Sequence, residues 1–144
     1  MSISLLDANT IIQIAIQTAR SQKAAPLAVV VLDPGGHLKA FQSEDRIGFL
    51  RGDIAFAKAW SALGMRQPSR QLASRAEKQP MFFTSLLAVS RGRMALSAGG
   101  VICIDTQGDI VGSVGISGDT ADVDEICAVA GIEAAGFRAL ATSG

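Results

Sequence analysis

Hydrophobic positions near the amino terminus recur with the period of an α-helix. Ser4 and Asp7 have the spacing of a capping box, which predicts a helix that begins there and runs to about Gln22. One face of that helix is apolar and carries Ala8, Ile11, Ile12, Ala15 and Ala19. We expect this face to pack on the core of the protein.

Two later segments have the pattern of β-hairpins. The continuous β-prone run 27–32 predicts a central strand, and Asp-Pro-Gly-Gly at 33–36 predicts a tight turn into a second strand over 37–41. Farther along the chain, the runs 101–105 and 110–116 predict two more strands joined by a short turn. Hairpins of this kind favour antiparallel pairing.

Apolar stretches between and after the hairpins predict further helices over about 49–63, 68–76, 80–89 and 121–140. The last helix is expected to turn Ile126, Ala130, Ala134 and Phe137 inward. The segment 93–97 could supply a fifth strand. This order of helices and hairpins predicts an α+β fold, in which helices pack on one antiparallel sheet within a single domain that spans the whole chain, residues 1–144.

The composition narrows the choice of partners. Of the residues, 49% are hydrophobic and 18% charged, and 13 basic residues balance 13 acidic ones, so the chain lacks the positive charge that nucleic-acid binding requires. No apolar run reaches the length of a membrane span, and the first residues lack the pattern of a signal peptide. We therefore expect a cytoplasmic protein that does not insert into membranes. Helices that are apolar on more than one face favour a homo-oligomer.

The chain has two cysteines, Cys103 in a predicted strand and Cys127 in a predicted helix. Both are most simply interpreted as small buried hydrophobic residues with free thiols. No Cys-x-x-Cys spacing and no neighbouring histidine indicate a zinc site.

The glycine-rich block 99–118 is the segment that most strongly indicates a ligand site. Its second strand leads through Ser117, Gly118 and Asp119 into the last helix, whose first backbone N–H groups have no partners within the helix. Such amides beside small side chains suit an anionic ligand, so Ser117 and Gly118 are candidate binding residues. Ser117 lacks the surrounding sequence of a nucleophile elbow.

His37, the only histidine, directly follows the first predicted turn. Its imidazole is a candidate metal ligand or general base, and the alternative is an ordinary histidine at the edge of a turn, solvated or hydrogen-bonded. Asp33 begins the same turn. Its carboxylate is expected to accept backbone N–H groups across Gly35 and Gly36, or otherwise to line a polar pocket.

Lys58 and the acids of the last helix form the other candidate set. Lys58 lies in the apolar segment Ile-Ala-Phe-Ala-Lys-Ala-Trp, where it is either a partner in a structural ion pair or a ligand for an anion. Asp124 and Glu125 stand in the first turn of the last helix, where carboxylates interact favourably with the helix dipole. Glu125 would pair naturally with Lys58, either as a structural bridge or as an acid–base dyad. We expect both in one polar cluster beside Ser117 and Gly118.

These segments together resemble the GlcG/HbpS family (DUF336), which includes the carboxy-terminal domain of PduO-type proteins. The most specific matches are DPGGH at 33–37, the helix around Lys58, GGVICID at 99–105, GSVGISGDT at 112–120 and DEICAVAG at 124–131. The resemblance extends from Asp7 to Phe137. It implies a profilin-like fold, with an antiparallel sheet of about five strands flanked by helices.

The resemblance also implies roles for the candidate residues. Several family members bind haem, which makes His37 a candidate axial ligand of the haem iron. Lys58 matches a lysine of a family helix, where a cation would bind a carboxylate or a haem propionate. Asp124 and Glu125 match an acidic pair that lies near the pocket edge in the family. An octamer is implied as the assembly.

Three functional hypotheses stay open at this point. The first is a soluble, oligomeric small-ligand-binding protein with haem as its ligand. The second is a small enzyme acting on a carboxylate-bearing metabolite, in which Lys58 holds the acid and Glu125 or His37 moves a proton. The third is a structural or regulatory oligomer without catalysis. Haem requires an apolar slot with an imidazole, whereas the enzyme requires a smaller and more polar pocket with a perturbed acid or base.

Overall fold

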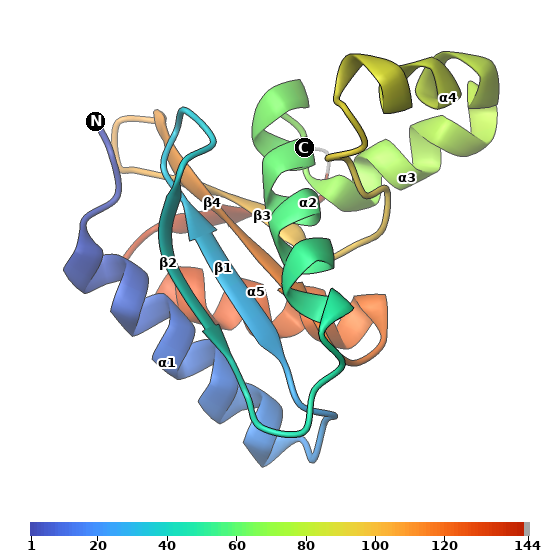
Figure 1. Cartoon of the computed structure of the whole chain (residues 1–144). Coiled ribbons are helices and arrows are strands. Elements are labelled where there is room, and N and C mark those ends of the chain that lie inside the picture. The colour runs from blue at the N-terminus through green and yellow to red at the C-terminus, as the bar shows by residue number, and fades with distance from the viewer. Residues whose placement is uncertain (143–144) are drawn as a thin grey trace.

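The computed structural model of the chain describes residues 1–142, which contain a five-stranded sheet (Figure 1). The strands follow the order β2-β1-β4-β3-β5, and every neighbouring pair is antiparallel. They are β1 (Ala28–Leu32), β2 (Leu38–Ser43), β3 (Gly100–Ile104), β4 (Ile110–Ser117) and β5 (Arg138–Leu140). The α+β expectation is therefore confirmed, and both hairpins lie within two residues of their predicted positions.

Helices cover both faces of the sheet. They are α1 (Leu5–Ser21), α2 (Leu50–Met65), α3 (Ser69–Lys78), α4 (Pro80–Val89) and α5 (Ala121–Ala134). Figure 1 shows α1 and α5 together on one face and α2 on the other, while α3 and α4 extend away from the sheet. Among residues 1–142, no helix is long and apolar enough to cross a membrane.

The first helix forms as the sequence predicts. The Ser4 hydroxyl oxygen accepts a hydrogen bond from the Asp7 N–H over 3.0 Å, which caps the first turn of α1. The buried residues of α1 are those of the predicted stripe, Ala8, Ile11, Ile12, Ala15 and Ala19. This stripe packs on α5 and on the sheet, so α1 and α5 form one layer of the fold.

The central strand β1 supplies side chains to two separate cores. Val29 and Val31 pack on the side of α1 and α5, while Ala28, Val30 and Leu32 pack on the side of α2. All of β1 is buried. Its uninterrupted apolar sequence follows from this position between two layers of helices.

The end of the last helix differs from the prediction. α5 ends at Ala134 rather than continuing through 140, because Gly136 adopts the left-handed conformation with φ 90°. The Phe137 N–H then donates to the Ile132 carbonyl oxygen over 3.2 Å, as in a Schellman motif. A glycine just past the helix end is the sequence signal for this termination.

The fifth strand is β5, which pairs with β3, so the prediction of a strand at 93–97 is wrong. The predicted inward stripe of the last helix is also wrong, since Ile126 is 48% exposed and Ala134 is exposed. The helix buries instead Asp124, Cys127, Ala128, Gly131 and Ile132. Small residues allow close approach to α1, because a Cβ on Gly131 would stand 2.5 Å from the Ile11 carbonyl oxygen.

Glycines of the block 99–118 make room for α2. A Cβ on Gly115 would collide with the Ala55 carbonyl oxygen, and a Cβ on Gly100 would collide with the carbonyl oxygen of Lys58. The face of α2 that meets these glycines is rich in buried alanines. The space that these glycines leave is therefore filled by a helix of the same chain.

Cys103 and Cys127 are buried and free, as predicted. Burial raises the pKa of the Cys103 thiol to about 12. Burial, followed by the nearby Asp124 carboxylate, raises the pKa of the Cys127 thiol to about 11. Neither thiol is ionised near neutral pH, so both act as small core residues.

Candidate functional site

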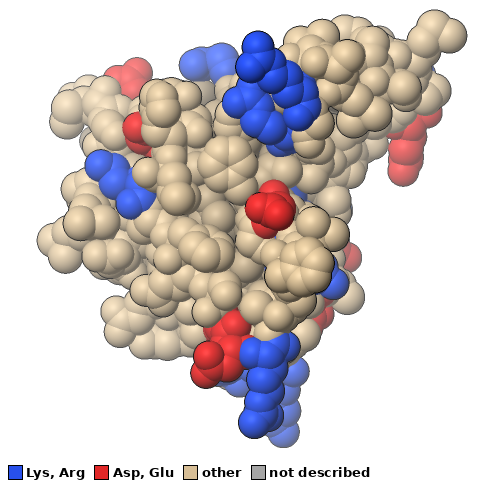
Figure 2. All heavy atoms as spheres, viewed as in Figure 1, with Lys and Arg blue, Asp and Glu red and all other residues tan. Residues whose placement is uncertain are grey.

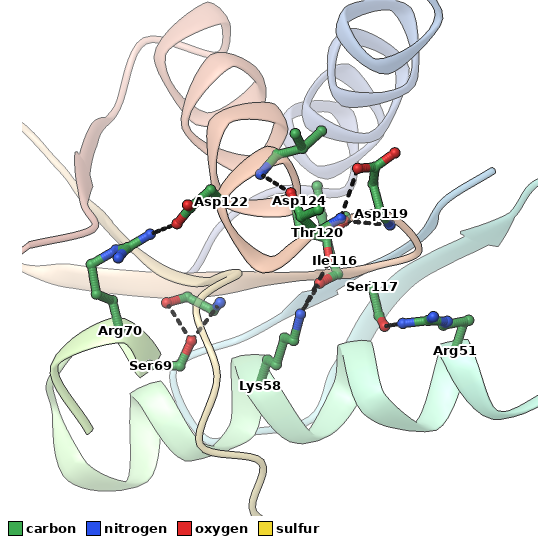
Figure 3. Close-up of polar contacts among 12 residues, drawn as sticks. Arg51, Lys58, Ser69, Arg70, Ile116, Ser117, Asp119, Thr120, Asp122 and Asp124 are labelled. Atoms are coloured by element: carbon green, nitrogen blue, oxygen red, sulfur yellow. Dashed lines mark hydrogen bonds and ion pairs between the residues drawn. The ribbon is translucent and has the colours of Figure 1, made fainter. Parts of the chain in front are cut away.

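Lys58 is a buried cation that joins three elements of the fold (Figure 3). It stands on α2 with 3% of its surface exposed, and its Nζ donates to the Ile116 carbonyl oxygen at 2.9 Å and to Asp124 Oδ2 at 3.2 Å. Gly99 permits this reach, because a Cβ there would stand 2.9 Å from Nζ. Lys58 thereby links α2 to the end of β4 and to the start of α5.

Asp124 is the second member of this interior pair, as we call Lys58 and Asp124. Its side chain is buried, and Oδ1 accepts the Asp119 N–H at 2.9 Å. Burial lowers the pKa of Lys58 and raises the pKa of Asp124, since desolvation outweighs the mutual attraction and the hydrogen bonds that favour both charged forms. The carboxylate facing Lys58 is therefore Asp124 rather than the expected Glu125.

Glu125 pairs with Arg70 of α3 instead. The Arg70 Nε donates to Glu125 Oε2 at 2.9 Å and to Oε1 at 3.2 Å, and its Nη2 pairs with Asp122. Successive residues of a helix point about 100° apart, so two adjacent acids cannot face the same partner. Asp124 points to the interior, and Glu125 points to α3 and fastens it to α5.

Several amides at and just before the start of α5 are hydrogen-bonded within the chain. The Thr120 Oγ1 accepts the Val123 N–H at 3.3 Å, and the Asp119 Oδ1 accepts the Thr120 N–H at 2.7 Å (Figure 3). Asp124 takes the N–H of Asp119 in turn. Oxygens of the chain itself therefore use some of the amides that the sequence offers to an anionic ligand.

Ser117 and Gly118 lie at the end of β4 beside the interior pair, and both serve the architecture. Ser117 is buried, and its Oγ accepts a hydrogen bond from Arg51 Nη1 at 3.2 Å. A Cβ on Gly118 would collide with the Pro26 carbonyl oxygen. The structure thus places Ser117 and Gly118 beside Lys58 as predicted, but with Asp124 in the place expected for Glu125 and in a closed region.

His37 stands in the open, just after the turn between β1 and β2. Its side chain is 80% exposed, and its Nδ1 lies 3.2 Å from Asp33 Oδ1. The same oxygen accepts the N–H of Gly35 at 2.9 Å and that of His37 at 3.0 Å. Desolvation is the largest single influence and acts to raise the pKa of Asp33, but the hydrogen bonds from Gly35 and His37 and the nearby imidazole together lower it. Asp33 therefore shapes the turn, as predicted, and also contacts the imidazole; we call these two residues the turn pair.

A shallow groove beside the turn pair runs along the exposed side of α2. One hollow of about 140 Å³ is lined by Pro34, Gly35, Gly36, Trp60, Leu63 and Gly64. A second hollow, of about 150 Å³, is lined by residues that include Trp60, Gly64, Met65, Leu86 and Met94. Trp60 and Gly64 belong to both hollows, so we describe the two as the Trp60 groove.

The turn rests directly against the Trp60 groove. A Cβ on Gly36 would stand 3.2 Å from the indole of Trp60, so a glycine lets the turn contact this ring. On the ring face, the Arg93 guanidinium lies 4.3 Å from the ring centre. Trp60 and Arg93 are not among the residues that the sequence pattern indicates. The available signal was a lone tryptophan on the side of α2 away from its buried alanines.

Comparisons with known proteins agree on one relationship. A family model described as "Haem degrading protein HbpS-like" matches residues 3–133. An uncharacterized 15.0 kDa protein from the dhaT-dhaS intergenic region of Citrobacter freundii is 25% identical over 114 residues, which are 79% of each chain.

Solved structures share the fold over nearly the whole chain. The haem complex of PduOC superimposes with a TM-score of 0.85 at 22% identity, covering 95% of this chain and 97% of the other. A double mutant of HbpS from Streptomyces reticuli gives a TM-score of 0.79 at 25% identity, covering 92% and 86%. Protein ORFY from Klebsiella pneumoniae gives 0.81 at 24% identity, covering 92% and 90%.

Proposed function

This chain belongs to the family of haem-degrading HbpS-like proteins, and we propose that it binds haem at the Trp60 groove with His37 as the axial ligand. The observation that carries the proposal is the turn pair. It consists of an exposed imidazole whose Nδ1 contacts a carboxylate at 3.2 Å, next to an apolar groove. PduOC, a structural neighbour, has been crystallised as a haem complex.

The turn pair prepares one ring nitrogen of His37 for a metal. When Asp33 accepts the proton of Nδ1, the neutral ring carries its lone pair on Nε2. A carboxylate behind a metal-binding histidine fixes the ring orientation and raises its basicity. A porphyrin supplies the equatorial ligands of the iron itself, so a single imidazole is a sufficient protein ligand.

The groove offers the other contacts that a porphyrin needs. Trp60, Leu63 and Pro34 provide apolar surface, and Gly64 leaves the helix surface low between the two hollows. Neither hollow reaches the roughly 300–1,000 Å³ of an enclosed ligand site, so the ligand would keep one side in solvent. Arg93, held on the face of Trp60, is a cation suited to a propionate. Bound haem would supply a redox-active iron.

The contacts of Lys58 argue against the alternative of an enzyme that acts on a small carboxylate. That hypothesis requires Lys58 to meet the substrate, yet Lys58 is 3% exposed and bonded to Asp124 and Ile116. Glu125 is engaged by Arg70. These contacts favour an architectural role for the interior pair and leave the turn pair as the site for chemistry.

Haemin titration tests the proposal. The wild-type protein is expected to give a sharp, red-shifted Soret band, and His37→Ala is expected to lose it. Gln42→Ala, an exposed change on the same hairpin, is the matched control and should behave like wild type. Asp33→Asn should weaken binding by about 10–100-fold, as outer-shell changes do at metal sites. A broad band in the wild type, or an unchanged band in His37→Ala, would overturn the proposal.

We propose also that the chain forms a homo-oligomer, an octamer as the family resemblance implies, with α4 at a contact between copies. Among the residues of α4, only Phe83 is buried, and none is charged. Met81, Leu87 and Val89 are 86%, 55% and 76% exposed. Such an apolar helix on a projecting arm favours burial against another copy. Light scattering at micromolar concentration should give a multiple of 14.9 kDa, and a mass of 14.9 kDa would contradict the proposal.

A further inference from the structure

A different hollow lies at the start of α2, away from the turn pair. It has a volume of about 280 Å³ and is lined by Phe41, Phe49, Phe56, Leu38, Val30 and Asp53. Figure 2 shows the face over β2 and α2 as mostly uncharged surface in which an acidic patch stands apart. Aromatic walls around a carboxylate are a chemically specific combination, and the fold constructs it in an identifiable way.

A bulge in β2 places two of the walls on the same side of the sheet. Phe41 pairs with Val30 and Leu38 pairs with Leu32, while Lys39 is the extra residue between them. Val30 and Leu32 both pack on the α2 side. Without the extra residue, Leu38 and Phe41 would lie on opposite faces, because side chains alternate along a strand.

The first turns of α2 supply the other walls and the charge. Phe49, Gly52, Asp53 and Phe56 are spaced three, four and seven residues from the first, so they share one helix face. Gly52 lets the Phe41 ring reach the helix, since a Cβ there would stand 3.1 Å from the ring Cζ. The result is a carboxylate one helical turn from two phenyl rings, with a third ring opposite.

The Asp53 carboxylate has no internal partner to neutralise it. Within residues 1–142, the ion pairs are those of Arg20, His37, Lys58 and Arg70, and none of them reaches Asp53. No donor among these residues makes a hydrogen bond to its carboxylate either. Asp53 is exposed, so the hollow presents a negative charge that faces solvent and has no partner in the chain, beside apolar surface.

We propose that this hollow binds a small organic cation, an N-methylated ammonium group of the choline or tetramethylammonium type. Phenyl faces attract such a cation through the ring quadrupole, and the carboxylate adds a direct charge interaction. N-methyl groups spread the charge and need no hydrogen bonds, so they suit walls of phenylalanine that offer none. The volume of about 280 Å³ accommodates a ligand of this size.

A second copy of the chain is a less suitable occupant for the hollow. A two-fold contact brings the same patch of both copies together, so it would place two Asp53 carboxylates near each other in apolar surroundings. Like charges in such a setting repel, and neither would have a counter-ion from this patch. A bound cation would neutralise the Asp53 carboxylate, whereas a second copy would add another carboxylate beside it.

Calorimetric titration with choline tests the inference, with 3,3-dimethylbutan-1-ol as the neutral isostere. Choline is expected to bind at least about tenfold more tightly than the isostere, and Asp53→Asn should lower its affinity about fivefold or more. Phe56→Leu keeps the apolar volume but removes a ring, and it should also weaken binding. Asp109→Asn, an exposed acid in the turn between β3 and β4, is the control and should leave the affinity unchanged.

The titration is performed without haemin and repeated in His37→Ala, so that its result is independent of the haem proposal. Equal affinity for choline and its isostere would overturn the inference. An affinity that Asp53→Asn leaves unchanged would overturn it as well. If Phe49→Ser converts a wild-type oligomer into monomers, the occupant of the hollow is a second copy. That result would also overturn the inference.

Discussion

Two pairs of basic and acidic side chains have the same separation and opposite surroundings. Lys58 Nζ lies 3.2 Å from Asp124 with side chains 4% and 1% exposed, and His37 Nδ1 lies 3.2 Å from Asp33 with side chains 80% and 29% exposed. The interior pair fastens α2 to α5, whereas the turn pair leaves a ring nitrogen in solvent. Distance alone therefore does not separate an architectural pair from one available to a ligand; burial does.

The pKa values of the two carboxyl groups are shifted in opposite directions, in keeping with this difference in burial. Desolvation dominates at Asp124 and raises its pKa. At Asp33 desolvation is outweighed by hydrogen bonds from the turn amides and from His37, which lower its pKa. A charge kept in the interior at such a cost must be held by the fold, so its removal should damage stability before it affects any ligand.

The largest expected effect is that of breaking the interior pair on one side. Lys58→Met leaves the buried Asp124 carboxylate without its cation, which should lower the free energy of unfolding by about 3–5 kcal/mol. Chemical denaturation measures the loss. The double variant Lys58→Met/Asp124→Asn keeps an oxygen for the Asp119 N–H and removes the unpaired charge, so it should recover most of the stability. If Lys58→Met were as stable as wild type, the interior pair would not stabilise the fold, and its burial would not distinguish it from the turn pair.

Gly99→Ala should have the next largest effect on stability. The absence of a side chain at Gly99 leaves the space in which the Lys58 side chain reaches its partners. The new Cβ would stand 2.9 Å from Lys58 Nζ and 2.8 Å from the Ile116 carbonyl oxygen, at a position with φ 127°. We expect a loss of about 1–3 kcal/mol in the free energy of unfolding. Gly92→Ala is the matched control, since Gly92 also has a positive φ, of 73°, but nothing lies within 4 Å of its Cβ position. Equal losses in both variants would attribute the effect to backbone strain alone.

The predictable part of the fold is the part in which one pattern allows one arrangement. The most continuous apolar stripe of α1 is the one that is buried, so its buried residues follow from the sequence. Apolar residues occur on every side of α5 and its acids are spread among them, so its inward face is decided by tertiary contact, in which Gly131 meets Ile11. β5 is three residues long and exists through pairing with β3. No local pattern in so short a segment identifies a strand.

The same limit applies to the candidate site. The glycines of 99–118 leave space at the sheet, but a missing side chain does not identify the group that fills the space, which here is α2. The burial of Lys58 is a consequence of its apolar neighbours. Its choice of Asp124 over Glu125 depends on the rotation of α5, which the Gly131 contact sets. The hollow at Asp53 depends on a bulge at Lys39 that no residue pattern announces.

Removal of the ion pairs between Arg70 and the acids of α5 should have a smaller effect on stability. Arg70 is 41% exposed in its side chain and contacts Asp122, which is 77% exposed, and Glu125, which is 14% exposed. Arg70→Ala should therefore lower the free energy of unfolding by no more than about 1 kcal/mol, as expected for exposed ion pairs in water. Added salt should reduce the difference from wild type, because it screens exposed charges. A loss as large as that of Lys58→Met would contradict the distinction between buried and exposed pairs.

The last prediction concerns the pH dependence of the two carboxylates, which should have opposite signs. The folded-state pKa of Asp33 lies below the usual 3.8, so its ionisation stabilises the fold above that value, and the contribution disappears as pH falls through the folded pKa. The folded-state pKa of Asp124 lies above 3.8, so the folded protein takes up this proton before the unfolded chain does. Its contribution is then fully present below 3.8 and is lost as pH rises through the folded pKa.

Denaturation curves from about pH 3 to pH 7 for wild type, Asp33→Asn and Asp124→Asn measure both slopes. The stability advantage of wild type over Asp33→Asn should shrink as the solution becomes acidic. Relative to Asp124→Asn, wild type should gain stability as the solution becomes acidic. The reason is that the folded protein binds a proton at Asp124 more readily than the unfolded chain does. Slopes of the same sign would mean that burial does not distinguish the two pairs, and the assignment of Asp33 and His37 to the ligand site would lose its physical basis.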